Sequence, residues 1–223
     1  MRVMGPFEIG EVLARGGTAI VHAARCHDDP TLDLVAKVAT AGAELGLHHE
    51  NSTLREIEHP HIIAPVGFVD DGSGAVMVLP RAACSLRAHA SRLKAAEVAH
   101  VAISIAEALA AIHRAGYAHA DVTPGNVLLR RDGSAVLADF GNATRCTEAA
   151  ARADIAQLAA TCLDALDSGG DDSVRALFAS IAAEPVSAVD LVGRLRELVP
   201  DSQPPDPSAS VPIVDEPPTM AAG

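Results

Sequence analysis

The stretch HADVTPGNVLLRRDGSAVLADFG, residues 119–141, places an Asp five positions before an Asn and a second Asp directly before Phe-Gly. Between these polar groups, residues 127–138 form two apolar runs around an Asp-Gly pair, which is the strongest short signal for a hairpin turn. The stretch therefore predicts a polar loop, a tight hairpin and a second acidic residue in close succession.

The N-terminal part of the chain has a β-type pattern. Residues 7–39 contain three short apolar runs broken by Gly-rich or polar turns, and two more runs follow at 61–69 and 74–80. Between them, residues 44–57 carry leucines loosely at helical spacing, and His59-Pro60 would end that helix. We expect a five-stranded antiparallel sheet with one inserted helix.

The pattern becomes helical from about residue 84. An amphipathic core helix is expected at 95–115, since apolar residues recur there every three or four positions, and further helices are expected at 152–167, 173–183 and 187–198. From Pro200 onward the chain has no Lys or Arg and is rich in Pro, which predicts a disordered tail. The expected domains are 1–80, 81–199 and the tail 200–223.

Composition excludes several classes of protein. A formal net charge of −12 argues against nucleic acid as a partner, because such binding needs clustered Lys and Arg. The N-terminus does not resemble a signal peptide, and no stretch of 18 residues lacks a charge, so we expect a cytoplasmic protein without membrane insertion. The four cysteines and ten histidines lack ligand spacing, and no structural metal is assigned.

The opening stretch resembles the protein kinase superfamily. His119-Ala120-Asp121 with Asn126 is similar to the catalytic loop H-R-D-L-x-x-x-N, and Asp139-Phe140-Gly141 matches D-F-G. The resemblance covers about residues 7–198 and is strongest to bacterial eukaryotic-like Ser/Thr kinases. It implies an α+β, bilobal fold with ATP between the lobes. It also implies that Asp121 orients the acceptor hydroxyl, while Asn126 and Asp139 bind Mg²⁺.

The resemblance also assigns nucleotide-binding residues in the N-terminal part. ARGGTAIV, residues 14–21, is similar to the glycine-rich loop G-x-G-x-x-G-x-V. Of the three glycines of that motif only the middle one is kept, as Gly16, with Gly17 beside it. Val35-Ala36-Lys37-Val38 resembles V-A-I-K, whose Lys contacts phosphates and pairs with a helical Glu, here Glu50. Adenine would lie between three apolar side chains and bond to a hinge at Leu79 to Arg81. The three side chains are Val21, Ala36 and Leu128. The packed spine of the active state would include Leu54, His119 and Phe140.

Four departures limit what can be carried over from the family. Thr123 stands where Ser/Thr kinases carry a Lys, and Ala120 replaces an Arg that grips a phosphorylated activation loop. Asp154, at the start of a later helical pattern, follows Asp139 by only 15 positions, without an A-P-E motif. The Arg that would pair with the Glu of that motif is missing too, so an unpaired buried charge is avoided.

Three functions remain open at this point. The first is a minimal protein kinase that uses ATP and Mg²⁺ to phosphorylate Ser or Thr on a partner or on its own tail. The second is a small-molecule phosphotransferase, favoured by the loop HADVTPGN and by the missing peptide platform. The third is a pseudokinase, a nucleotide-binding or protein-binding regulatory module, favoured by Thr123 and the degraded glycine loop.

Overall fold

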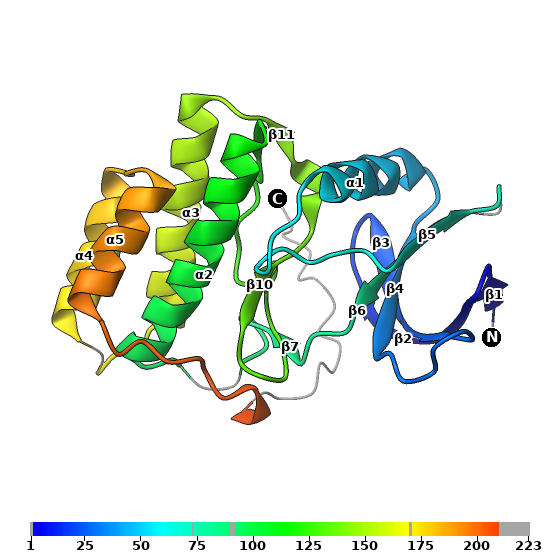
Figure 1. Cartoon of the computed structure of the whole chain (residues 1–223), viewed down its shortest axis with the longest axis horizontal. Coiled ribbons are helices and arrows are strands. Elements are labelled where there is room, and N and C mark those ends of the chain that lie inside the picture. Colours follow the sequence, from blue (N-terminus) through cyan, green and yellow to red (C-terminus); the bar gives the residue numbers. More distant parts are fainter. Residues whose placement is uncertain (1, 73, 90–91, 170, 210–223) are drawn as a thin grey trace, which may run out of the picture.

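The computed structural model describes residues 2–72, 74–89, 92–169 and 171–209, and it consists of a sheet-rich N-terminal lobe and a helical C-terminal lobe (Figure 1). The expected α+β, bilobal fold is confirmed. The N-terminal sheet is antiparallel and has the order β1-β2-β3-β4-β6-β5. Its strands are Arg2–Met4 (β1), Phe7–Arg15 (β2), Ala19–Cys26 (β3), Leu34–Ala39 (β4), Gly67–Asp70 (β5) and Ala75–Pro80 (β6).

The sheet has six strands instead of the five expected. The added strand β1 folds back on β2, with Met4 opposite Phe7, through a turn in which Gly5 has a φ of +56°. A residue without Cβ adopts this left-handed conformation readily. Burial of the Met4 side chain, which is 2% exposed, holds the short strand in place.

One helix, α1 (Glu44–Glu56), packs against the sheet, close to the expected range of 44–57. The segment that follows it differs from the expectation. Residues 61–63 pair with the C-terminal lobe instead of the sheet: the Ile63 N–H donates to Leu137 O at 3.0 Å, and the Leu137 N–H donates to His61 O at 2.9 Å. The chain returns to the sheet at Val66, whose N–H donates to Val78 O at 2.8 Å. This segment therefore connects α1 to the other lobe, and the strand β5 begins only at Gly67.

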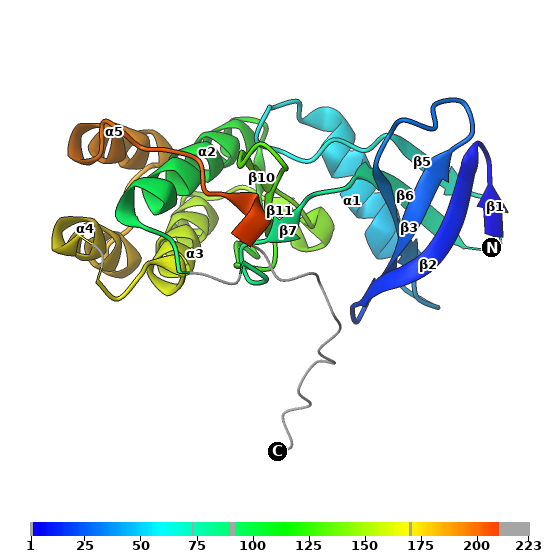
Figure 2. The ribbon, with the colours of Figure 1, turned by 90° about the horizontal axis from the view of Figure 1, so that it is seen from below.

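The C-terminal lobe is built on four long helices and several short strands (Figure 2). The expected helices are present, with α3 beginning four residues earlier than expected because Thr147 caps it, its side chain accepting from the Ala150 N–H at 3.1 Å. The helices are Ala95–Arg114 (α2), Glu148–Ala165 (α3), Asp172–Ala183 (α4) and Ala188–Leu198 (α5). The short strands are Cys84–Ser85 (β7), Tyr117–Ala118 (β8), Val127–Leu129 (β9), Ala135–Leu137 (β10) and Thr144–Arg145 (β11).

The helix α2 forms the centre of this lobe. By length and composition alone it could cross a membrane. However, its side chains at Ile105, Leu109 and Ile112 are fully buried in the main core, which extends from the C-terminal helices to α1 and β6. This burial matches the expected core helix.

The first ten residues of the predicted tail, 200–209, pack on the C-terminal lobe, which corrects the expectation of disorder from residue 200. The Gln203 N–H donates to Ala96 O at 3.2 Å, His89 Nε2 lies 3.1 Å from Asp206 O, and Pro205 is buried. The Pro205 carbonyl oxygen lies against Gly133, whose φ of +81° and close neighbour leave no room for a Cβ. Residues 210–223 lie outside the described residues.

Candidate active site

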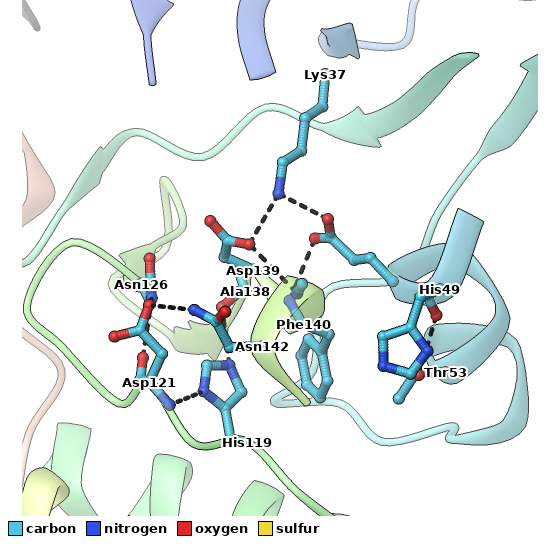
Figure 3. A network of polar contacts seen from close by, with 12 residues as sticks. Lys37, His49, Thr53, His119, Asp121, Asn126, Ala138, Asp139, Phe140 and Asn142 are labelled. Atoms are coloured by element: carbon cyan, nitrogen blue, oxygen red, sulfur yellow. Dashed lines mark hydrogen bonds and ion pairs between the residues drawn. The ribbon is translucent and has the colours of Figure 1, made fainter. Parts of the chain in front are cut away.

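A cluster of three charged side chains lies where the two lobes meet (Figure 3). Lys37 comes from β4, Glu50 from α1, and Asp139 from the segment after β10. Lys37 Nζ lies 2.7 Å from Glu50 Oε2 and 2.9 Å from Asp139 Oδ1. The pairing of Lys37 with Glu50 that the family resemblance implied is thus present, and it joins the sheet, the helix and the Asp-Phe-Gly segment.

Burial and charge act in opposite directions on this cluster. Burial alone would lower the pKa of the Lys37 ammonium, but the carboxylates of Glu50 and Asp139 outweigh it and raise that pKa above its ordinary value. Burial also raises the pKa of the Glu50 carboxyl, and the positive charge of Lys37 only partly opposes this. The two neighbouring carboxylates therefore favour the charged form of Lys37.

The Asp-Phe-Gly segment holds a strained conformation that aims its side chains in two directions. Asp139 has a φ of +62°, unusual for a residue with a Cβ, and it begins the short 3₁₀ helix η1 (Phe140–Asn142). The Phe140 N–H donates to Glu50 Oε1 at 3.2 Å, and the Phe140 ring packs edge-on against His119 at 4.8 Å between centroids. Leu54, Phe140 and His119 are all buried, as expected for an assembled spine.

The catalytic-loop residues form a second polar group beside the first. Asn126 Nδ2 donates to the Asp121 carbonyl oxygen at 2.9 Å and to Asp121 Oδ2 at 3.0 Å. The Ala138 N–H donates to Asn126 O at 2.9 Å, which ties this loop to the residue before Asp139. The hairpin β9–β10 thus brings Asp121, Asn126 and Asp139 to one side of the lobe, as the opening stretch of sequence suggested.

Asp154 anchors the catalytic loop through hydrogen bonds from α3, a role that the sequence did not reveal. Its buried carboxylate accepts hydrogen bonds from the His119 N–H at 2.9 Å, the Ala120 N–H at 2.8 Å and His113 Nε2 at 2.8 Å. Ala120 has a φ of +62°, so this grip also maintains a strained residue. The available signal was an acidic residue within the otherwise apolar face of α3, and such a residue usually faces solvent.

A cavity of about 340 Å³ opens beside these groups. Its walls include Gly17 to Ala19 from the β2–β3 turn, the charged cluster, and Asp121 with Asn142. The turn itself is tight and exposed, and the Gly16 N–H donates to Ala19 O at 2.9 Å. One cavity therefore contains five of the residues predicted on the phosphate side: Gly17, Lys37, Glu50, Asp121 and Asp139. Gly16 precedes Gly17 in the chain and is not among the lining residues.

The structure corrects one of the predicted adenine contacts. Side chains alternate along a strand, so Ala36 points away from the face that carries Lys37. Ala36 is fully buried in a separate core between β1, β2 and β6, whereas Val35 shares the face of Lys37 and packs on the main core. Val35 therefore takes the position that the resemblance gave to Ala36. The sequence signal for this is spacing: Val35 lies two positions before Lys37, whereas Ala36 is adjacent to it.

Of the other predicted adenine contacts, Val21 lies opposite Lys37 in the β3–β4 pair and so shares its face. Leu128 lies on β9 and is partly buried against the main core. The adenine-binding role of these two residues stays a prediction.

The predicted hinge at Leu79 to Arg81 stays a prediction, but the structure limits its hydrogen-bond donors. Leu79 pairs with Val35 inside the sheet, and the Arg81 N–H donates to Asp33 O at 2.9 Å, so this donor is already used within the protein. Pro80 has no N–H. Among the described residues, Ala82 is the first after β6 whose N–H has no hydrogen-bond partner, which makes it the better candidate for bonding the edge of a base.

The predicted metal ligands carry oxygen atoms suited to Mg²⁺. Asn126 uses Nδ2 on Asp121, which leaves Oδ1 without a partner among the described residues, and Asp139 likewise keeps Oδ2 free. Mg²⁺ is usually held by one or two such groups together with phosphates. Within the described ranges, no group of three or more His, Cys, Asp or Glu side chains could hold a metal by itself. The residues fit a metal that arrives with a nucleotide.

Comparisons with known proteins point to the same family as the geometry. The chain is 34% identical over 147 residues to the serine/threonine-protein kinase PknK of Mycobacterium tuberculosis, which covers 60% of the chain and 13% of that relative. It is 32% identical over 156 residues to the probable serine/threonine-protein kinase SCO3848 of Streptomyces coelicolor, covering 63% of the chain and 23% of that relative.

A third relative is the serine/threonine-protein kinase PLK4 of Nematostella vectensis, 30% identical over 149 residues, which covers 62% of the chain and 15% of that relative. These matches span less than a quarter of the length of each of the three relatives. The family model for the protein kinase domain matches residues 7–161, more than half of the chain. With this match and the assembled Lys37, Glu50, Asp121 and Asp139, the chain belongs to the protein kinase superfamily.

Proposed function

We propose that this protein transfers the γ-phosphoryl group of ATP, with Mg²⁺, to a Ser or Thr hydroxyl of a partner protein or of its own tail. The observation that carries the proposal is the position of Lys37, within 2.9 Å of both Glu50 and Asp139. A module that only binds proteins has no need for this arrangement beside a cavity that also contains Asp121. Ser/Thr acceptors are favoured because the relatives described above bear that name.

The chain's own groups supply binding and orientation. The Lys37 ammonium, kept charged by two carboxylates, offers its N–H donors to the phosphates, while the turn at Gly17 to Ala19 borders them. Asn126 and Asp139 would hold Mg²⁺ through their free oxygens. The metal, when bound, would neutralise the negative charge of the phosphates.

Asp121 would act on the acceptor. The acceptor oxygen attacks the γ-phosphorus, its proton moves to the Asp121 carboxylate, and the bond from that phosphorus to the bridging oxygen breaks, so that ADP leaves with the electron pair. Asn126 binds one carboxylate oxygen of Asp121 and keeps the group in position for this proton transfer.

The test is transfer of label from γ-labelled ATP in the presence of Mg²⁺, with the full chain as enzyme. Lys37→Met and Asp121→Asn should each abolish incorporation into added protein or into the chain itself. Arg55→Met, which removes an exposed cation from α1, should leave transfer unchanged. Equal labelling by wild type and both site variants would refute the proposal. Mass spectrometry of labelled protein would then identify the acceptor residue.

A small-molecule acceptor is the second candidate, and one observation favours it. Only residues 143–147 connect η1 to α3, so the extended platform that would support a peptide is missing from this part of the structure. Testing sugars, amino alcohols and peptides as acceptors in parallel would separate the two. A nucleotide-dependent thermal shift without transfer to any acceptor would instead favour a nucleotide-binding pseudokinase.

A further inference from the structure

The carboxylate of Asp121 is held from two sides. Asn126 Nδ2 reaches Asp121 Oδ2 at 3.0 Å from within the catalytic loop. Asn142 Nδ2 reaches the same oxygen at 3.3 Å from η1, directly after the Asp-Phe-Gly segment (Figure 3). Two donors from separate elements therefore converge on one oxygen atom, and Oδ1 has no partner within the described residues.

Two donors on one oxygen fix the plane of a carboxylate, which otherwise rotates broadly about its last torsion. Asp121 and Asn142 both contribute to the wall of the cavity, so the carboxylate is fixed at the place where an acceptor would enter. Correct orientation of a proton acceptor is worth a large share of general-base catalysis. The second donor therefore has a consequence for rate, beyond its small contribution to stability.

Packing does not explain Asn142. Its side chain is exposed, and among the described residues its side-chain amide makes one hydrogen bond, to Asp121. Thr123, two residues after Asp121 in the same loop, makes no side-chain hydrogen bond within the part of the chain that the structure describes. The second side-chain donor to Asp121 thus comes from Asn142, on η1.

We propose that Asn142 is a positioning residue that orients Asp121 for proton transfer. The inference rests on the proposed phosphoryl transfer. It predicts that loss of the Asn142 amide slows the chemical step without weakening nucleotide binding. It also predicts that a movement of η1 changes the orientation of the Asp121 carboxylate, because Asn142 and Asp139 belong to the same short segment.

The kinetic test compares four variants by steady-state phosphoryl transfer. Asn142→Ala should lower kcat about three- to tenfold with the KM for ATP changed less than about twofold. Asn142→Asp, equal in shape but without a donor and with an added negative charge, should lower kcat further. Asn142→Gln, which keeps the amide, should recover part of the rate. Thr144→Ala, an exposed change two residues away, is the matched control.

A structural readout keeps the test independent of activity. A crystal structure of Asn142→Ala should show the Asp121 carboxylate rotated, with Asn126 as its remaining donor. An unchanged carboxylate together with an unchanged kcat would overturn the inference, as would a raised KM for ATP at constant kcat. Wild-type protein that transfers no phosphate would instead refute the proposed function. In that case the orientation of the Asp121 carboxylate in the Asn142→Ala structure would still show whether Asn142 orients Asp121.

Discussion

Replacing Asp154 by Ala should unfold the catalytic loop locally and destabilise the whole protein. Asp154 is fully buried and accepts three hydrogen bonds, from the N–H groups of His119 and Ala120 and from His113 Nε2. An alanine leaves all three without a partner. His119 is fully buried away from water, whereas His113 is partly buried and Ala120 is exposed.

The magnitude follows from these exposures. An unsatisfied buried donor costs about 1–3 kcal/mol and a partly accessible one about 0.5–1.5 kcal/mol, so the total loss in unfolding free energy is about 2–6 kcal/mol. For a chain of this size, that loss lowers Tm by about 5–20 °C. Asp154→Asn keeps one acceptor oxygen and should lose about half as much.

Thermal and urea unfolding followed by circular dichroism would measure the effect, and hydrogen exchange would report on the amides of His119 and Ala120. Glu148→Ala serves as control, since Glu148 lies on the same helix but is exposed and forms only a surface ion pair with Arg152. If Asp154→Ala unfolds within about 2 °C of that control, the carboxylate does not support the loop and the reasoning is wrong.

Three further predictions concern the same region. Glu50→Gln removes the charge that pairs with Lys37 and should reduce phosphoryl transfer at least about tenfold while Tm, measured in parallel, changes by less than about 3 °C. Ala120→Val should lower Tm, because a β-branched residue fits poorly at a φ of +62°, whereas Ala120→Gly should maintain or raise it; equal effects would contradict the strain. Burial lowers the pKa of the His119 imidazole below its ordinary 6.5, so the unfolded chain binds more protons and stability should fall as pH drops below about 6.5. His119→Tyr should show a shallower decline of Tm between pH 7 and 5, and an equally steep decline would assign the effect to other histidines.

Much of the fold could be predicted because its strongest signals are local. The Asp-Gly turn fixed the hairpin β9–β10, and apolar spacing gave α2 within one residue at its C-terminal end. The Lys37 and Glu50 pairing was predictable only through the family resemblance, since 13 positions separate the two residues. Their contact depends on how α1 packs against the sheet.

The rest depended on contacts between distant segments. The start of the apolar run at 61–69 reads as a strand, yet residues 61–63 bond to Leu137 of the other lobe. Residues 200–209 look disordered by composition, but Pro205 finds a buried place beside Gly133. Neither partner is visible from local pattern, because each contact joins segments that are more than 60 positions apart.

The short link between η1 and α3 has a consequence for inhibitor design. Its residues are tied at both ends: His49 Nε2 lies 2.9 Å from Ala143 O, and the Cys146 N–H donates to Gly116 O at 2.8 Å. A compound that displaces Phe140 from the core would have to break these bonds and the β8–β11 pairing, since no slack chain can absorb the movement. Ligands that occupy the cavity with Phe140 in place should therefore bind this kinase far better than ligands that require its ring to leave.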